Sequence, residues 1–328
     1  MTVEPGTSSA VVWSWSHALL GAVYAVPAAV VVLVDPARGI ALAVGVLPAA
    51  AAGLPGPRRG RVAIALLGAL MGASMLVGSL LAQVPVLAVP AIFALCVGAA
   101  AAASRGKVGQ VALALGVPLI GIGLSYDDPR ETVGIALLMA VGSAYACLVS
   151  LAWPARPAPE PGEPGSVGRR AMLRYGVLLG FAGATAAAIG FLLHLDHVGW
   201  ACGAALLVMR PNPDLLRLRG VDRAWSVLVG AALGGGLVLA HPPAAVLAAA
   251  VVVALAALAA TKGSHRYVTP MFTTFLVFLL LLVDNPQETT GRFLERMGET
   301  LLGVTLAVIF GMAVPALLTR RQRSAAQQ

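Results

Sequence analysis

The sequence predicts an all-α integral membrane protein with about 12 transmembrane helices, arranged as two parallel six-helix repeats. Three observations support this fold class: the composition, two pairs of related motifs and the distribution of basic residues. Hydrophobic residues make up 59% of the 328 residues, and charged residues only 11%. Because a bilayer core needs about 20 apolar residues per helix, a chain of this composition is built to cross a membrane, and a soluble core is excluded.

Twelve apolar segments follow one another along the chain. We expect membrane helices over 17–34, 37–54, 62–82, 84–103, 108–124 and 132–152, then over 172–193, 197–209, 222–240, 243–260, 267–283 and 291–318. They form a first membrane unit at 1–153 and a second unit at 171–328, which ends in a short basic tail. The Pro/Gly-rich segment 154–170 is too short to fold alone and is predicted to be a flexible cytoplasmic linker.

Two motif pairs indicate an internal repeat. DDPRET at 127–132 recurs as DNPQET at 284–289, and GALMG at 68–72 recurs as GAALG at 230–234. We interpret the first pair as helix caps, with Asp128 and Asn285 at the N-cap and Glu131 and Glu288 bonding back to it. An aspartate-rich magnesium site of a membrane enzyme is the alternative. The paired glycines are predicted to let helices pack closely.

The excess of basic residues is explained by membrane topology, which excludes nucleic-acid binding as its cause. Alternate loops and the C-terminal tail hold the Arg and Lys residues within 58–61, 105–107, 156–174, 210–223, 262–266 and 320–323, and the other side holds only Arg38, Arg130, Arg292 and Arg296. Basic loops stay in the cytoplasm, so both termini and the linker are predicted to be cytoplasmic in a cell inner membrane. An even number of spans in each unit makes the repeats parallel.

The last apolar segment carries four charges at helical spacing. Arg292, Glu295, Arg296 and Glu299 lie on one helical face, whereas the first repeat has apolar residues or glycine at the positions 157 residues earlier. Ionisable groups in a membrane segment face a partner helix or an aqueous path, because exposing them to lipid is costly. We therefore predict a solute pathway, in which Arg292 and Arg296 bind a substrate carboxylate. Glu299 is predicted to couple protons, because a poorly hydrated site favours protonation of a carboxylate. A self-neutralising extension of the helix outside the membrane is the alternative.

Further candidates lie near 197–223. Trp200 is a candidate for substrate binding, with interfacial anchoring as the alternative. Arg223, close to Arg210 and Arg219 in sequence, is predicted to capture organic anions from the cytoplasm. His194, Asp196 and His197 are interpreted as a solvated turn, with a proton relay as the alternative.

Nothing in the sequence points to a cofactor or a metal. The three cysteines are scattered through apolar segments without ligand spacing. No P-loop motif occurs, so ATP-driven transport by this chain is not expected.

The second half resembles the FUSC family, the fusaric acid resistance protein-like group also called aromatic acid exporters. The resemblance rests on HVGWACGAALLVMRPNP at 197–213, Arg223 followed by GAALGGG, RYVTPMFTTFLVFLLLL at 266–282 and RMGETLLGVTLAVIFGMAVPALL at 296–318. It implies an inner-membrane exporter of aromatic or related organic acids, driven by the proton gradient. Trp200, Pro211, Arg223, Arg296 and Gly303 fall on positions that the family tends to keep. The large cytoplasmic domain between the halves is reduced here to the linker.

The sequence thus predicts a secondary transporter that exports aromatic or other organic carboxylic acids by proton coupling. A passive organic-anion channel is the main alternative, and a membrane-embedded enzyme is a weaker one, so the chain is not expected to be an enzyme. The expected partners are a small organic anion and the lipid bilayer, and assembly into a homo-oligomer is left open.

Overall fold

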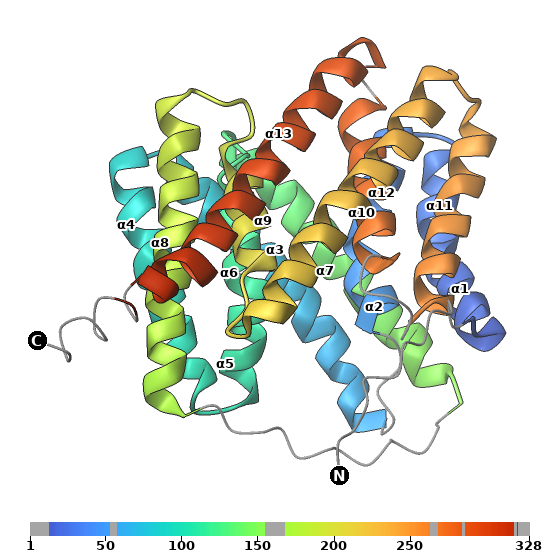
Figure 1. Ribbon diagram of the computed structural model, residues 1–328. Helices are drawn as coiled ribbons and strands as arrows, with labels where there is room; N and C mark the ends of the chain where they lie inside the picture. The colour runs from blue at the N-terminus through green and yellow to red at the C-terminus, as the bar shows by residue number, and fades with distance from the viewer. Residues whose placement is uncertain are drawn as a thin grey trace, which may run out of the picture.

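The computed structural model describes residues 13–52, 58–154, 168–262, 268–283, 286–317 and 320, which form helices and loops without a strand (Figure 1). Within these residues, seven helical segments are long and apolar enough to cross a membrane. They contain α1 (Trp15–Val32), α3 (Val62–Ala82), α4 (Pro85–Ala103), α7 (Pro129–Ala152), α8 (Arg169–Leu192), α10 (Pro213–Leu239) and α13 (Thr289–Val308). The prediction of an all-helical, multi-pass membrane protein is confirmed.

Five shorter apolar helical segments lie between them. They are α2 (Pro36–Ala52), α9 (Val198–Val208), α11 (Ala244–Ala260), α12 (Val268–Leu282) and a continuous segment made of α5 (Lys107–Val111), a π-helical turn (Ala112–Gly116) and α6 (Val117–Gly123). Each expected apolar range therefore contains a helix. That all of them span the bilayer stays a prediction.

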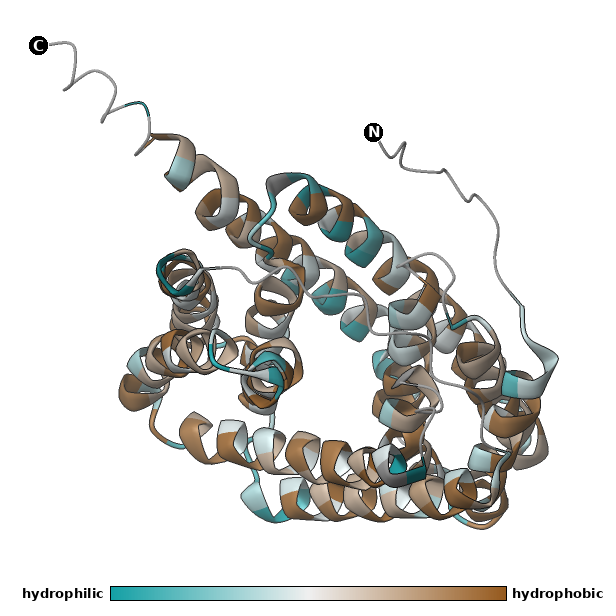
Figure 2. Cartoon of the chain, turned by 90° about the horizontal axis from the view of Figure 1, so that it is seen from below, coloured by the Kyte–Doolittle hydropathy of each residue, from teal (hydrophilic) through white to brown (hydrophobic). Residues whose placement is uncertain are grey.

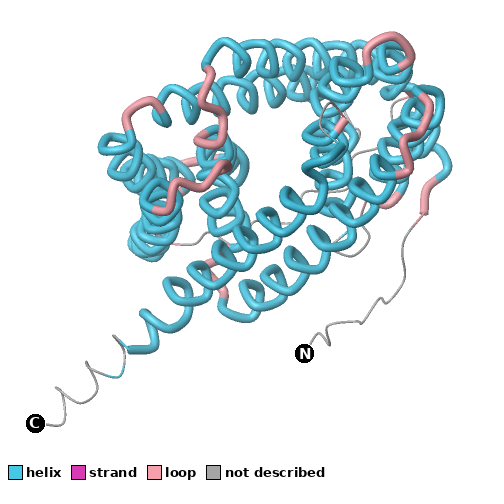
Figure 3. Tube along the Cα trace, turned by 90° about the horizontal axis from the view of Figure 1, so that it is seen from above, coloured by secondary structure: helices cyan, strands magenta, loops and turns pink. Residues whose placement is uncertain are grey.

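Eight helices contact one another in a closed ring. Its order is α7, α2, α12, α10, α13, α9, α6 and α3, which returns to α7. Figures 2 and 3 show this ring from below and from above, along its axis. Outside it, α1 packs between α2 and α11, and α8 packs between α9 and α4. A contact in one half thus has a counterpart in the other: α7 packs on α2 as α13 packs on α9.

The two copies of the acidic motif begin their helices differently. Asp128 caps α7 as predicted, because its Oδ1 accepts a hydrogen bond from the Arg130 backbone N–H at 2.8 Å. In the second copy Pro286–Glu288 form a 3₁₀ turn and α13 begins only at Thr289. The helical segment thus begins at Pro286, but its first turn is 3₁₀, and Glu288 pairs with Arg292. Asn285 lies outside the described residues.

The paired glycines pack closely against other helices, as predicted, but their neighbours are not equivalent. Gly68 lies against Ser143 of α7, and Gly230 lies against Thr274 of α12. A side chain at either position would clash with the facing helix. The two motifs therefore both allow close helix packing, but α3 and α10 use them against helices that are not equivalent in the two halves.

Arg61 fixes the end of α7 to the start of α3. Its guanidinium is fully buried and donates hydrogen bonds to the backbone carbonyls of Ser150, Trp153 and Pro154, the last two at 2.7 and 3.2 Å. The last carbonyls of a helix have no partner within the helix, so one charged side chain here satisfies several of them.

We expect Arg61→Ala to lower the stability of the protein by roughly 3 kcal/mol, because it leaves buried carbonyls without donors. Thermal unfolding of the purified protein in detergent measures the change. Arg58→Ala is the matched control, since Arg58 is an exposed arginine of the same turn. Equal melting temperatures for the two variants would contradict this role of Arg61.

Candidate functional site

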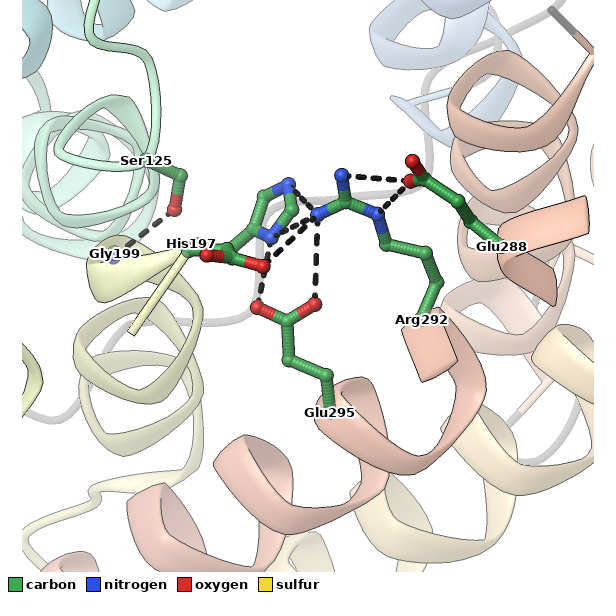
Figure 4. Close-up of polar contacts among 7 residues, drawn as sticks. Ser125, His197, Gly199, Glu288, Arg292 and Glu295 are labelled. Atoms are coloured by element: carbon green, nitrogen blue, oxygen red, sulfur yellow. Dashed lines mark hydrogen bonds and ion pairs between the residues drawn. The ribbon is translucent and has the colours of Figure 1, made fainter. Parts of the chain in front are cut away.

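A network of charged side chains surrounds the first turn of α13 (Figure 4). Arg292 is at its centre. The guanidinium lies 2.9 Å from Glu288, 3.5 Å from Glu295 and 3.9 Å from Asp196, which belongs to the loop before α9. The nitrogens of Arg292 are thus already engaged by carboxylates of the protein.

His197 joins this network to α9. Its Nδ1 lies 2.9 Å from Oε1 of Glu295, and its ring stacks on Trp200 with the ring centroids 4.0 Å apart. Figure 4 shows the imidazole next to both the carboxylate of Glu295 and the guanidinium of Arg292. The side chain of His197 is only 12% exposed. The interpretation of this residue as part of a solvated turn is therefore wrong, because tertiary contacts from α13 cover it.

The start of α9 is held in place from the first half of the chain. The backbone N–H of Gly199 donates to Oγ of Ser125 at 2.9 Å, which ties α9 to the loop between α6 and α7. Gly199 also packs directly on the backbone of α6, where a side chain would clash. Close packing of this kind fixes the height of His197 and Trp200 relative to α13.

His197 lies in a loop, and its protonation is sensitive to this environment. Burial lowers the pKa of His197 below its ordinary value, and the positive charge of Arg292 acts in the same direction. The hydrogen bond and charge of Glu295 oppose this shift, as does Asp196. The imidazole is therefore neutral at pH 7.

One turn along α13, Arg296 is buried against Trp200. The side chain is 6% exposed and its guanidinium carbon lies 4.3 Å from the centroid of the Trp200 ring. A desolvated cation over an indole ring is stabilised by roughly 2 kcal/mol, so Trp200 holds the guanidinium in a fixed place. Nε of Arg296 is buried and has no hydrogen-bond partner among the described residues.

Glu299 follows one turn later and is buried too. It is 4% exposed, and neither of its carboxylate oxygens has a hydrogen-bond partner in the described part of the chain. An ionised carboxylate without a partner is very unfavourable inside a protein. The alternative that these charges form a solvated helix extension does not fit Arg296 and Glu299, because both are buried.

Arg223 lies on the neighbouring helix. The sequence placed it at the start of a membrane segment, whereas the structure extends α10 back to Pro213, so that Arg223 stands inside the helix. Its Nε is buried and has no hydrogen-bond partner among the described residues, and its charge interacts with that of Arg296. Arg210 and Arg219 interact with Tyr175 of α8.

Tyr126, in the loop between α6 and α7, is a site residue that the sequence analysis missed. Its phenol interacts electrostatically with Arg296 and Glu131. No pattern within the second half indicated it, because the contact comes from the first half.

Metal-binding chemistry finds no support in the described residues. They contain no group of three or more His, Cys, Asp or Glu side chains placed to hold an ion. Cys96, Cys147 and Cys202 are free thiols, and all three are buried.

The helices α9, α10 and α13 lie within one segment that matches a known family. Residues 185–310 match the fusaric acid resistance protein-like family. The resemblance seen in the sequence is confirmed over this range, which holds Trp200, Arg223, Arg292, Arg296 and Glu299. Comparisons with curated proteins and with solved structures find no significant match. The fusaric acid resistance protein-like segment and the apolar helices together indicate a membrane transport protein of the efflux type.

We expect His197 to make stability depend on pH. The unfolded chain binds a proton at this histidine near pH 6.5, whereas the folded protein binds it only at lower pH. The free energy of unfolding should therefore decrease as the pH is lowered from about 7.5 to about 5, because protons bind preferentially to the unfolded state.

Melting curves of wild type and His197→Gln across this pH range test the expectation. The variant should lose less stability in acid than the wild type. His241→Asn is the control, because His241 is exposed and has a left-handed backbone conformation that asparagine tolerates. A wild-type pH dependence that persists unchanged in His197→Gln would contradict the assignment.

Proposed function

We propose that the protein is a secondary transporter that exports aromatic or other organic carboxylic acids, coupled to protons through Glu299. The observation that carries this proposal is the buried pair of Arg296 and Glu299, each with polar atoms that no described residue satisfies. Polar groups buried without partners inside a membrane protein are a mark of a solute or proton path.

Arg296 is the best placed residue to bind the carboxylate. Trp200 stacks on the guanidinium, and Nε at the edge of the guanidinium has no hydrogen-bond partner among the described residues. A guanidinium donates two parallel hydrogen bonds to a carboxylate, which an ammonium group cannot do. Arg223 adds a second positive charge from α10.

Arg292 fits a different role from the one predicted for it. Because Glu288, Glu295 and Asp196 already neutralise it, it is a poor partner for a substrate while this network stands. The network joins α13 to the loop before α9, one helical turn before the buried pair. Arg292 would meet a substrate only after its ion pairs break, as alternating access of one bundle against another requires.

The arrangement of the helices supports two parallel repeats of six spans. The first helix of each half packs on the fourth helix of the other half: α1 packs on α11, and α8 packs on α4. A two-fold axis along the membrane normal produces this exchange. We propose this symmetry, with both termini in the cytoplasm of an inner membrane.

Cysteine labelling tests the topology. In intact cells, a cysteine at Gln287 should react with a membrane-impermeant thiol reagent, and a cysteine at Arg217 should react only after the cells are opened. Both positions are exposed, and the native cysteines are buried, so labelling reports the introduced thiol. Reaction of the Arg217→Cys protein alone in intact cells would invert the topology and with it the direction of export.

Transport assays test the assignment of Arg296 and Glu299. In proteoliposomes, Arg296→Lys should lower the apparent affinity for carboxylates about tenfold, because the fork geometry is lost while the charge remains. Glu299→Gln should abolish acceleration by a proton gradient and leave counterflow measurable. Arg130→Lys is the control, since Arg130 is exposed at the start of α7.

Unchanged transport in both stable variants would show that these residues are structural. Rapid flux that ignores the proton gradient in the wild type would favour the passive anion channel.

A further inference from the structure

The buried pair consists of a cation and an anion that do not satisfy each other. Arg296 and Glu299 are three residues apart on α13, which separates them by about 4.5 Å along the helix axis. Both are more than nine-tenths buried. Within the part of the chain that the structure describes, the Glu299 oxygens nevertheless accept no hydrogen bond and Nε of Arg296 donates none.

Neighbouring side chains leave this pair available to a ligand. Glu295, the nearest acidic residue on the same helix, is engaged by His197 and Arg292. Asp196 lies 3.9 Å from Arg292. The charged groups that act on Glu299 are therefore Arg292, Glu295 and Arg296 on its own helix and Asp196 before α9, and none of them donates a hydrogen bond to it.

A simple carboxylate would satisfy only half of this site. It would pair with Arg296, but it would place a second negative charge close to Glu299 and leave both Glu299 oxygens without donors. A ligand that carries an ammonium group beside its carboxylate would pair with both side chains. Each charge of the buried pair would then have a partner of opposite sign, as buried charges require.

We propose that this site binds a zwitterionic amino acid, with its carboxylate on Arg296 and its ammonium group on Glu299. The inference rests on the proposed transport function and narrows its substrate class. Because the two side chains are one helical turn apart, the ammonium group is on the carbon next to the carboxylate or one carbon further. Trp200, with 4% of its surface exposed, supports Arg296 and offers no free face for stacking an aromatic substrate.

The proposal also gives the coupling a mechanism. Glu299 holds either a proton or the ammonium group of the ligand, so the two compete for one carboxylate. Competition for a shared site makes the carrier exchange a proton for an amino acid, which is the coupling that export against a gradient requires. No covalent step is involved.

Matched ligands test the proposal on the purified full-length protein in nanodiscs. Each α-amino acid is compared with its deaminated acid: alanine with propionate, leucine with 4-methylpentanoate, phenylalanine with 3-phenylpropionate, and tryptophan with indole-3-propionate. For at least one pair, the amino acid should bind ten times more tightly or better. Glu299→Gln should remove that preference, and it should leave the affinity for the deaminated acid unchanged or increased.

Asp214→Asn is the control, because Asp214 is an exposed carboxylate in the first turn of α10 and belongs to neither the network around Arg292 nor the buried pair. It should keep the preference for the amino acid. Thermal unfolding shows whether each variant folds, and Glu299→Asp, which keeps the charge, should retain part of the preference. If Glu299→Gln does not fold, a weakened preference in Glu299→Asp supports the proposal, because the shorter side chain withdraws the carboxylate from the ammonium group, and an unchanged preference overturns it.

The outcomes distinguish a failure of the amino acid proposal from a failure of the proposed transport function. Deaminated acids that bind as tightly as the amino acids would overturn the amino acid assignment and leave carboxylic acid transport standing. If no acid of the panel bound or crossed the membrane, the proposed function itself would fail.

Discussion

The burial of Arg296 and Glu299 between helices is the constraint on which the rest of the site depends. Neither side chain is at a helix end, both are buried, and both carry polar atoms that no described residue satisfies. Trp200 compensates part of the cost by stacking on the guanidinium. This stack needs α9 at a fixed height, which the close packing of Gly199 on α6 and of Gly303 on α9 provides. The small residues of these helices are therefore requirements of the charged site.

The two halves solve the same packing problem with different chemistry. In the first half, α7 packs on α2 through glycine, with Gly142 of α7 against Gly45 of α2. In the second half, α13 packs on α9 in the same way. At the offset of 157 residues between the repeats, however, the counterpart of Gly142 is Glu299, so a charged residue takes the place of a glycine. A closely packed apolar interface between two helices is stable when closed, and opening it is unfavourable. An interface that encloses charges without partners is less stable when closed. A ligand that pairs with these charges stabilises the conformation to which it binds.

Two layers of charge occupy α13. The outer network of Arg292, Glu295 and His197 is complete in itself, since each member has a partner. The inner pair is incomplete. A complete network favours the closed arrangement of α13 and the loop before α9, whereas an incomplete pair favours binding. Their succession along one helix, one turn apart, is the arrangement expected of a covered binding site.

The sequence by itself determined the membrane class, the location of the helical segments and the helical face of α13 that carries charge. Hydropathy and residue spacing suffice for these, because they depend on the bilayer and on the helix period. Asp128 as a cap and the family resemblance of 185–310 were likewise readable from short motifs.

Only the tertiary structure decided how the charges are divided. It engaged Arg292 and left Arg296 and Glu299 unsatisfied, it covered His197, and it placed Arg223 inside α10. It also brought Tyr126 and Ser125 from the first half to the site. A single sequence does not give these contacts. The spacing of charges along one helix is the same whether the facing helix supplies a carboxylate, an indole ring or no partner.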